Sequence, residues 1–95
     1  MLMNDQMKIS DLEKSISEKI FIRIEKWNLY LGDAGLARKL AFECINNFDK
    51  DNYENSKLSL DAINVKIGDG DQTISLLNLV TSTQISDLED ILDNL

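Results

Sequence analysis

The chain has 95 residues, a formal net charge of −7, 43% hydrophobic residues and 28% charged residues. This length fits one domain spanning residues 1–95, and the composition is that of a folded protein, which excludes wholesale disorder. The single cysteine, Cys44, excludes an intramolecular disulfide and a cysteine-based zinc site within one chain. No apolar run approaches the roughly 18 residues of a membrane span, so we expect a cytoplasmic protein.

The acidic excess lies entirely in the second half of the chain. Residues 1–50 hold eight basic and eight acidic side chains, whereas residues 51–95 hold two basic and nine acidic ones. An acidic field repels phosphate backbones and anionic lipids, so we expect neither a nucleic-acid nor a membrane partner. The excess indicates either a solvated surface that maintains solubility or a surface that attracts basic partners or cations.

The first predicted element is a long helix. Residues 1–8 are expected to be a disordered leader, and Ser10 with Glu13 has the spacing of a capping box. Apolar residues then recur at steps of three and four; they are Ile9, Leu12, Ile16, Ile20, Ile24, Trp27 and Leu31. This spacing predicts one continuous helix of about six turns from Ser10 to Leu31.

A glycine turn is predicted to join this helix to a second one. Gly32 stands where a helix ends in a left-handed glycine, and Asp33 is placed to cap the next helix. An apolar stripe that includes Cys44 predicts a helix over residues 34–48, packed antiparallel on the first. The polar stretch over residues 49–56 is predicted to be a loop.

A β-hairpin and a short helix complete the predicted fold. Apolar residues alternate over 63–67 and again over 74–76, on either side of the segment "GDGD". Residues 57–62 fit an added strand, a bulge or a helical turn. Ser82 or Thr83 is expected to cap a C-terminal amphipathic helix. We find no internal repeat, and the order predicts an α+β fold: an antiparallel helix pair, then a β-hairpin and a short C-terminal helix.

The chain lacks the usual general base at neutral pH, histidine, which excludes most hydrolase designs. The chain has no histidine, which excludes the Ser-His-Asp and Cys-His arrangements. Cys44 lies on the predicted buried stripe without a neighbouring cation, as is typical of a structural cysteine. Acidic pairs for proton transfer could come from Asp33 with Glu43 or from the acidic C-terminal segment, whose carboxylates we expect to be solvated.

Two glycine-containing segments resemble ligand-binding loops only in part. Asp69 and Asp71 have a carboxylate spacing found in calcium loops, but the glycine and glutamate of an EF-hand do not follow, and cation binding there stays open. "GDAG" at 32–35 has the form of a nucleic-acid-clamping GXXG loop without its basic residues. We therefore expect no bound metal and no cofactor.

The best candidate for a functional surface adjoins the glycine turn. From Ile20 onward, apolar residues leave the single stripe, so this part of the chain must be covered on more than one side. Trp27 and Tyr30 are typical of either a core or an interface. The residues that we assign to a candidate interaction surface are Trp27, Tyr30, Asp33, Phe21, Ile22 and Leu29.

One segment resembles a known family. "KWNLYLGDA" at 26–34, followed by "INVKIGDG" and "LNLVTS", is similar to a family of small uncharacterised cyanobacterial proteins with a Trp, a Leu-Tyr-Leu and a Gly-Asp-Ala in this order. The likeness covers residues 10–92. It implies a cyanobacterial source and a cytoplasmic setting, and it carries no activity, cofactor or catalytic residue.

These observations favour a non-catalytic protein-interaction or regulatory module. Its partner is expected to be another protein or a second copy of the chain, because the apolar surface predicted around residues 20–31 exceeds what one helix face can bury. The alternative is a small-molecule or metal-ion binding protein, conceivably an enzyme. Such a protein would use the carboxylates near Gly32–Gly35 or Gly68–Asp71.

Overall fold

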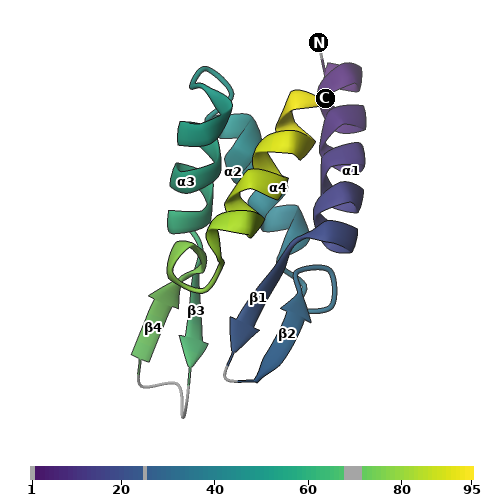
Figure 1. Ribbon diagram of the computed structural model, residues 1–95. Helices are drawn as coiled ribbons and strands as arrows, with labels where there is room; N and C mark the ends of the chain where they lie inside the picture. The colour runs from purple at the N-terminus through teal and green to yellow at the C-terminus, as the bar shows by residue number, and fades with distance from the viewer. Residues whose placement is uncertain (1, 25, 68–71) are drawn as a thin grey trace.

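The computed structural model describes residues 2–24, 26–67 and 72–95, which form four helices and two β-hairpins. Helix α1 is followed by the first hairpin and α2, and helix α3 by the second hairpin and α4 (Figure 1). The bounds are α1 Leu2–Lys19, β1 Phe21–Ile24, β2 Trp27–Tyr30, α2 Ala37–Asn46, α3 Asn52–Asp61, β3 Asn64–Ile67, β4 Gln72–Ser75 and α4 Ser82–Asp93, with a short 3₁₀ turn, η1, at Leu76–Asn78. The fold class is α+β, as predicted.

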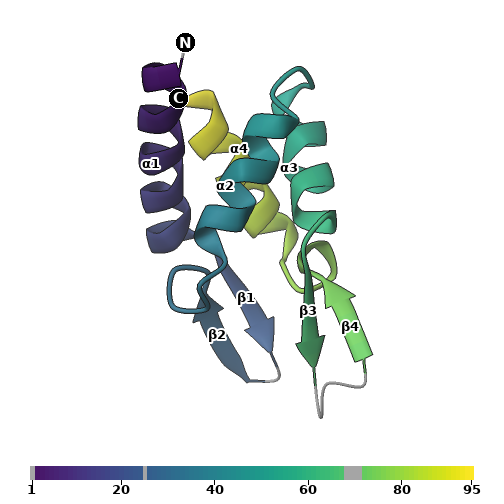
Figure 2. The same cartoon turned by 180° about the vertical axis from the view of Figure 1, so that it is seen from behind.

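The chain consists of two α-β-β-α units with the same element order, residues 2–46 and 52–93. The four helices form a bundle in which α1 packs on α2 and α4, and α3 packs on α4 and α2. Both hairpins extend from the same end of this bundle, and β1 and β3 are the inner strands in both views (Figures 1 and 2). The two chain ends lie beside each other at the opposite end of a molecule 42 Å long. The sequence analysis, which found no repeat, did not reveal this shared element order.

The prediction of one long helix from Ser10 to Leu31 is wrong, because a β-hairpin forms its second half. Helix α1 ends at Lys19, and residues 21–24 and 27–30, predicted to be helical, form the antiparallel pair β1–β2. The apolar residues of this segment fit the spacing of a helix, but Ile20, Ile22 and Ile24 also fit the two-residue alternation of a strand. The segment is rich in β-branched and aromatic residues, which favour strands. At its other end α1 begins at Leu2, within the expected leader, and Ser10 lies inside the helix.

The two glycines after β2 have different roles. Gly35 adopts a left-handed conformation with φ +72°, which was predicted for Gly32. Gly32 is needed for close packing instead, since a Cβ there would lie 2.8 Å from the Cβ of Ser17 on α1. Asp33 does not cap α2, because the N-cap position belongs to Leu36 and has no side-chain cap.

Helix α3 occupies much of the stretch predicted to be a loop. Asp51 caps it by accepting a hydrogen bond from the Glu54 N–H at 2.8 Å. Its buried face includes polar residues: the Asn55 side chain donates to the Cys44 carbonyl at 2.9 Å, and the Ser59 hydroxyl donates to Asn55 Oδ1 at 2.8 Å. A helix that buries polar groups shows no apolar stripe, so periodicity could not reveal it.

The second hairpin and the last helix follow the prediction. β3 pairs antiparallel with β4, and the "GDGD" segment at 68–71 lies outside the described residues. Thr81, one residue before the predicted cap, accepts a hydrogen bond from the Gln84 N–H at 3.3 Å and caps α4. Side chains from both units share one core. Its fully buried members include Leu12, Ile16, Ile20, Leu31, Leu40, Leu60, Leu76 and Leu88.

Candidate functional site

The two hairpins can be compared residue by residue, because their registers correspond. Phe21 pairs with Tyr30 and Ile22 with Leu29 in the first hairpin, as Asn64 pairs with Ser75 and Val65 with Ile74 in the second. The backbone N–H of Leu31 donates to Ile20 O at 3.0 Å, and that of Leu76 donates to Ile63 O at 2.9 Å. Residues 20–24 therefore correspond to 63–67, and residues 27–31 correspond to 72–76.

Positions that serve the core have the same character in both hairpins. Ile20 and Ile63 are buried, and so are Leu31 and Leu76. Three further positions differ, since Phe21, Trp27 and Tyr30 correspond to Asn64, Gln72 and Ser75. The second hairpin therefore forms with polar residues at these three positions.

We call Phe21, Trp27 and Tyr30 the aromatic surface. The rings of Phe21 and Tyr30 lie 5.4 Å apart at a tilt of 58°, a favourable aromatic pair on the base of the hairpin. Directly opposed residues point to the same face of a sheet, and successive residues of a strand point to opposite faces. Trp27 opposes Ile24, three residues after Phe21, so Trp27 lies on the face opposite to Phe21 and Tyr30, near the turn. It is 74% exposed, and Tyr30 is 41% exposed. The aromatic surface thus includes residues on both faces of the hairpin.

The remaining predicted site residues divide between core and surface. Ile22 is only 1% exposed and belongs to the core, so we remove it from the candidate site. Leu29, its cross-strand partner, is half-buried against the core. Asp33 is exposed in the turn that follows β2. The exposed residues that the sequence analysis missed are Arg23 and Asn28, a cross-strand pair on the face of Phe21 and Tyr30.

The hairpin is held on the bundle by contacts with the second unit. The Phe21 N–H donates to Oε1 of Gln84 at 2.7 Å, and the Arg23 N–H donates to the Leu79 carbonyl at 3.1 Å. Gln84 is only 4% exposed and also donates to Asp87 at 3.1 Å. These bonds fix the β1 backbone and leave the aromatic side chains accessible.

The cysteine considered for chemistry is buried, and the candidate cation ligands are not among the described residues. Cys44 is buried, and burial raises the pKa of its thiol from 9.0 to about 11, which opposes nucleophilic use at neutral pH. Outside residues 1, 25 and 68–71, no group of three or more carboxylate or thiol side chains is arranged to hold a metal ion. The proposed cation ligands Asp69 and Asp71 lie outside the described residues.

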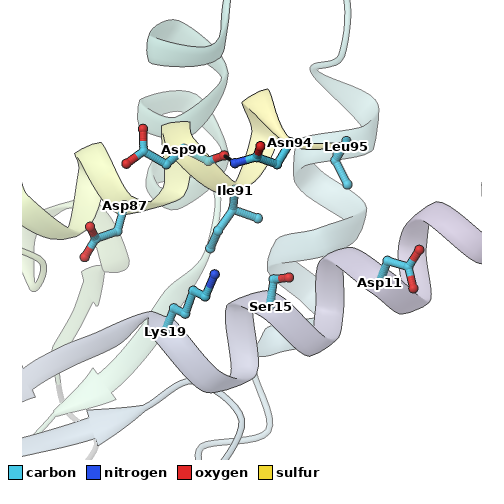
Figure 3. A pocket seen from close by; sticks show the side chains of 8 residues that line it. All are labelled: Asp11, Ser15, Lys19, Asp87, Asp90, Ile91, Asn94 and Leu95. Carbon is cyan, nitrogen blue, oxygen red and sulfur yellow. Dashed lines mark hydrogen bonds between the residues drawn. The ribbon is translucent and has the colours of Figure 1, made fainter.

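An open groove of about 520 Å³ lies between α1 and α4 (Figure 3). Asp11, Ser15 and Lys19 line it from α1, and Asp87, Asp90 and Ile91 line it from α4. The Lys19 ammonium points into the groove between the two helices. The groove combines solvated carboxylates with a small apolar floor and has no arrangement typical of catalysis.

Comparison with known proteins gives a family and one named relative. A family model described as a protein of unknown function, DUF3181, matches residues 9–95. The chain is 34% identical over 88 residues to "Thylakoid-associated protein slr0729" of Synechocystis sp. (strain ATCC 27184 / PCC 6803 / Kazusa), which covers 90% of this chain and 87% of that protein. No solved structure matches significantly. In the part of the chain that the structure describes, no helix has the length and apolar character needed to cross a membrane. The chain therefore belongs to the DUF3181 family, an uncharacterised cyanobacterial family.

Proposed function

We propose that this protein is a non-catalytic protein-interaction module whose first hairpin contacts its partner. The observation that carries the proposal is the difference between the two hairpins: the first presents Phe21, Trp27 and Tyr30 where the second has polar residues. An exposed tryptophan and tyrosine supply large contact area at a low cost in side-chain entropy and are enriched at interfaces. A tryptophan that is 74% exposed adds nothing comparable to the monomer's core.

The name of the relative suggests where such a module would work. That protein is named as thylakoid-associated. We propose that this chain also associates with the thylakoid, and that it does so through the aromatic surface, not through a membrane span. Arg23 and Lys26 are both exposed on this hairpin and, together with Glu25, give residues 21–30 a formal net charge of +1 in a chain of net charge −7. Such a charge would favour an acidic partner protein.

The test is affinity capture from a lysate of the source organism with wild-type protein and two matched variants. Trp27→Ala removes the most exposed aromatic side chain, and Gln72→Ala changes the corresponding residue of the second hairpin. Because an interface tryptophan is often a hot spot, Trp27→Ala is expected to weaken binding at least about tenfold. Gln72→Ala is expected to retain wild-type binding.

Both substitutions alter residues near a hairpin turn, so circular dichroism should show the same folded state for all three proteins. If Trp27→Ala captures every partner as strongly as the wild type does, the aromatic surface is not the binding site. If Gln72→Ala loses the partners to the same extent, the difference between the hairpins has no functional meaning. Either result would contradict the proposal.

A further inference from the structure

The outer edge of β2 is an unpaired strand edge. Each hairpin forms a two-stranded sheet, and β2 has β1 as its one strand neighbour among the described residues. Strand β1 lies between β2 and the second hairpin in both views (Figures 1 and 2). The other edge of β1 is engaged, because its Arg23 N–H donates to Leu79 O. On the outer edge of β2, the Tyr30 carbonyl already accepts a hydrogen bond from the Ala34 N–H at 3.0 Å, which leaves the backbone groups of Asn28 and the Tyr30 N–H for a further strand.

This edge lacks charge, proline and a bulge, three of the features that block strand pairing. Natural edge strands are protected by being very short, by charged side chains, proline or bulges, or by a covering loop, and the four-residue β2 has the first of these protections. Strand β2 has the sequence Trp-Asn-Leu-Tyr, without charge or proline, and it pairs with β1 in a continuous register without a bulge. The charged residues of the two sheets, Arg23 and Lys66, lie on the inner strands β1 and β3. The outer edge is thus open to another strand.

We propose that β2 pairs antiparallel with β2 of a second copy of this chain, which joins the two hairpins into a four-stranded sheet. The proposal rests on the proposed function and adds a second copy of the chain as a partner of the first hairpin. A two-fold contact requires a surface that is compatible with itself, and a strand without charge meets its own copy without repulsion. Each copy would satisfy backbone groups of the other, as in recognition by strand addition.

The geometry of such a dimer also suits the surrounding residues. A two-fold axis between antiparallel strands keeps equivalent faces on the same side of the joint sheet. The rings of Phe21 and Tyr30 from both copies would then form one continuous aromatic face. Strand β1 would be the outermost strand in each copy, so the two Arg23 residues would be about 14 Å apart, at about 4.8 Å per strand. This exceeds the Debye length of about 8 Å at physiological salt, and their repulsion is screened.

The second hairpin provides the matched control. Its outer strand β4 is also uncharged, but it has Gln72, Thr73 and Ser75 at the positions of Trp27, Asn28 and Tyr30. Pairing through β4 would therefore bury little apolar area, which is the main favourable contribution to association. The proposal accordingly assigns the dimer to β2 and not to β4.

The experiment compares Asn28→Glu on β2 with Thr73→Glu on β4. Both positions are exposed and lie opposite a basic residue, Arg23 or Lys66, so each glutamate gains a favourable partner inside its own hairpin. Only the glutamate on β2 would face its own copy across the two-fold axis. Sedimentation velocity from low to high micromolar concentration measures the dimer dissociation constant of each protein.

We expect a reversible wild-type dimer, an increase of about tenfold or more in the dissociation constant of Asn28→Glu, and no change for Thr73→Glu. A wild type that stays monomeric over the whole range, or equal weakening by both variants, would overturn the proposal. Hydrogen exchange of the wild type is a second measurement that needs no variant: the amides of β2 should gain protection as concentration rises, and constant exchange overturns the proposal. A monomeric wild type that still captures a partner through Trp27 would refute the dimer and leave the proposed function intact.

Discussion

The N–H of Leu31 donates to the carbonyl of Ile20 at 3.0 Å, and this bond closes the first hairpin at the point where both strands meet the helices. Both side chains are fully buried. The same bond recurs between Leu76 and Ile63 at 2.9 Å. The core is thus anchored twice in the same manner, once in each unit.

Truncation of either leucine is therefore expected to have a similar cost. Leu31→Ala and Leu76→Ala should each lower the free energy of unfolding by about 2–5 kcal/mol, because each removes a fully buried side chain and leaves a cavity. Urea denaturation measures this change. Leu58→Ala, at a site that is 40% exposed, is the control and should cost far less. A loss below about 1 kcal/mol at either buried leucine would contradict the shared core.

Alanine substitutions at the two glycines of the turn should destabilise the protein for different reasons. Gly35→Ala forces a side chain into the left-handed region and should cost about 1–2 kcal/mol, and Gly35→Asn should cost less, because asparagine tolerates that region. Gly32→Ala should cost about 1–3 kcal/mol through contact with Ser17.

A double-mutant cycle with Ser17→Gly separates the two causes. Removing the Ser17 Cβ should restore part of the stability lost in Gly32→Ala and none of that lost in Gly35→Ala. Thermal or urea unfolding of the single and double variants provides the energies. Equal rescue of both alanine variants would show that the turn acts as one strained unit.

Cys44 should make the protein less stable at alkaline pH. Burial raises the pKa of its thiol from 9.0 to about 11, so the unfolded chain loses the proton more readily than the folded one. The contribution is fully present below pH 9.0 and is lost as pH rises through about 11. Its size is on the order of 3 kcal/mol. The free energy of unfolding, measured over this range, should therefore fall more steeply for the wild type than for Cys44→Ala. Parallel curves would mean that the thiol is not the cause.

Trp27 is the only tryptophan, so its fluorescence reports on the first hairpin alone. At 74% exposure, the emission of the dilute protein should resemble that of free tryptophan in water and should be readily quenched by acrylamide. Trp27→Ala should change the free energy of unfolding by no more than about 0.5 kcal/mol, as is usual for surface substitutions. A blue-shifted, poorly quenched emission from the dilute protein would show that Trp27 is buried.

The sequence predicted the second hairpin and the C-terminal helix, because each had one clear period. It failed for residues 20–31, where Ile20, Ile24 and Trp27 fit the spacing of a helix while Ile20, Ile22 and Ile24 fit that of a strand. The decisive signal was the likeness of "IFIRI" at 20–24 to "INVKI" at 63–67, the strand already recognised. Helix α3 was missed because it buries Asn55 and Ser59, which periodicity counts as polar surface.

The sequence could identify which residue types belong to the candidate site, but not which of those residues face solvent and which face the core. Trp27 and Tyr30 were selected as core or interface residues, and both are exposed. Ile22 was selected with them because apolar residues on several sides of a supposed helix all appeared to need cover. In a strand the same residues alternate, so Ile22 enters the core while its neighbour Arg23 faces solvent. Recognising the strand was therefore the step on which the site depended.

The placement of both chain ends opposite the hairpins has a practical consequence. A fluorescent domain, an affinity handle or a chemical tether attached at either end would lie up to about the molecule's 42 Å length from the hairpins. A surface coated with protein attached in this way would display the hairpins outward in a uniform orientation. Binding measured on such a surface would sample the end of the molecule where the two units differ.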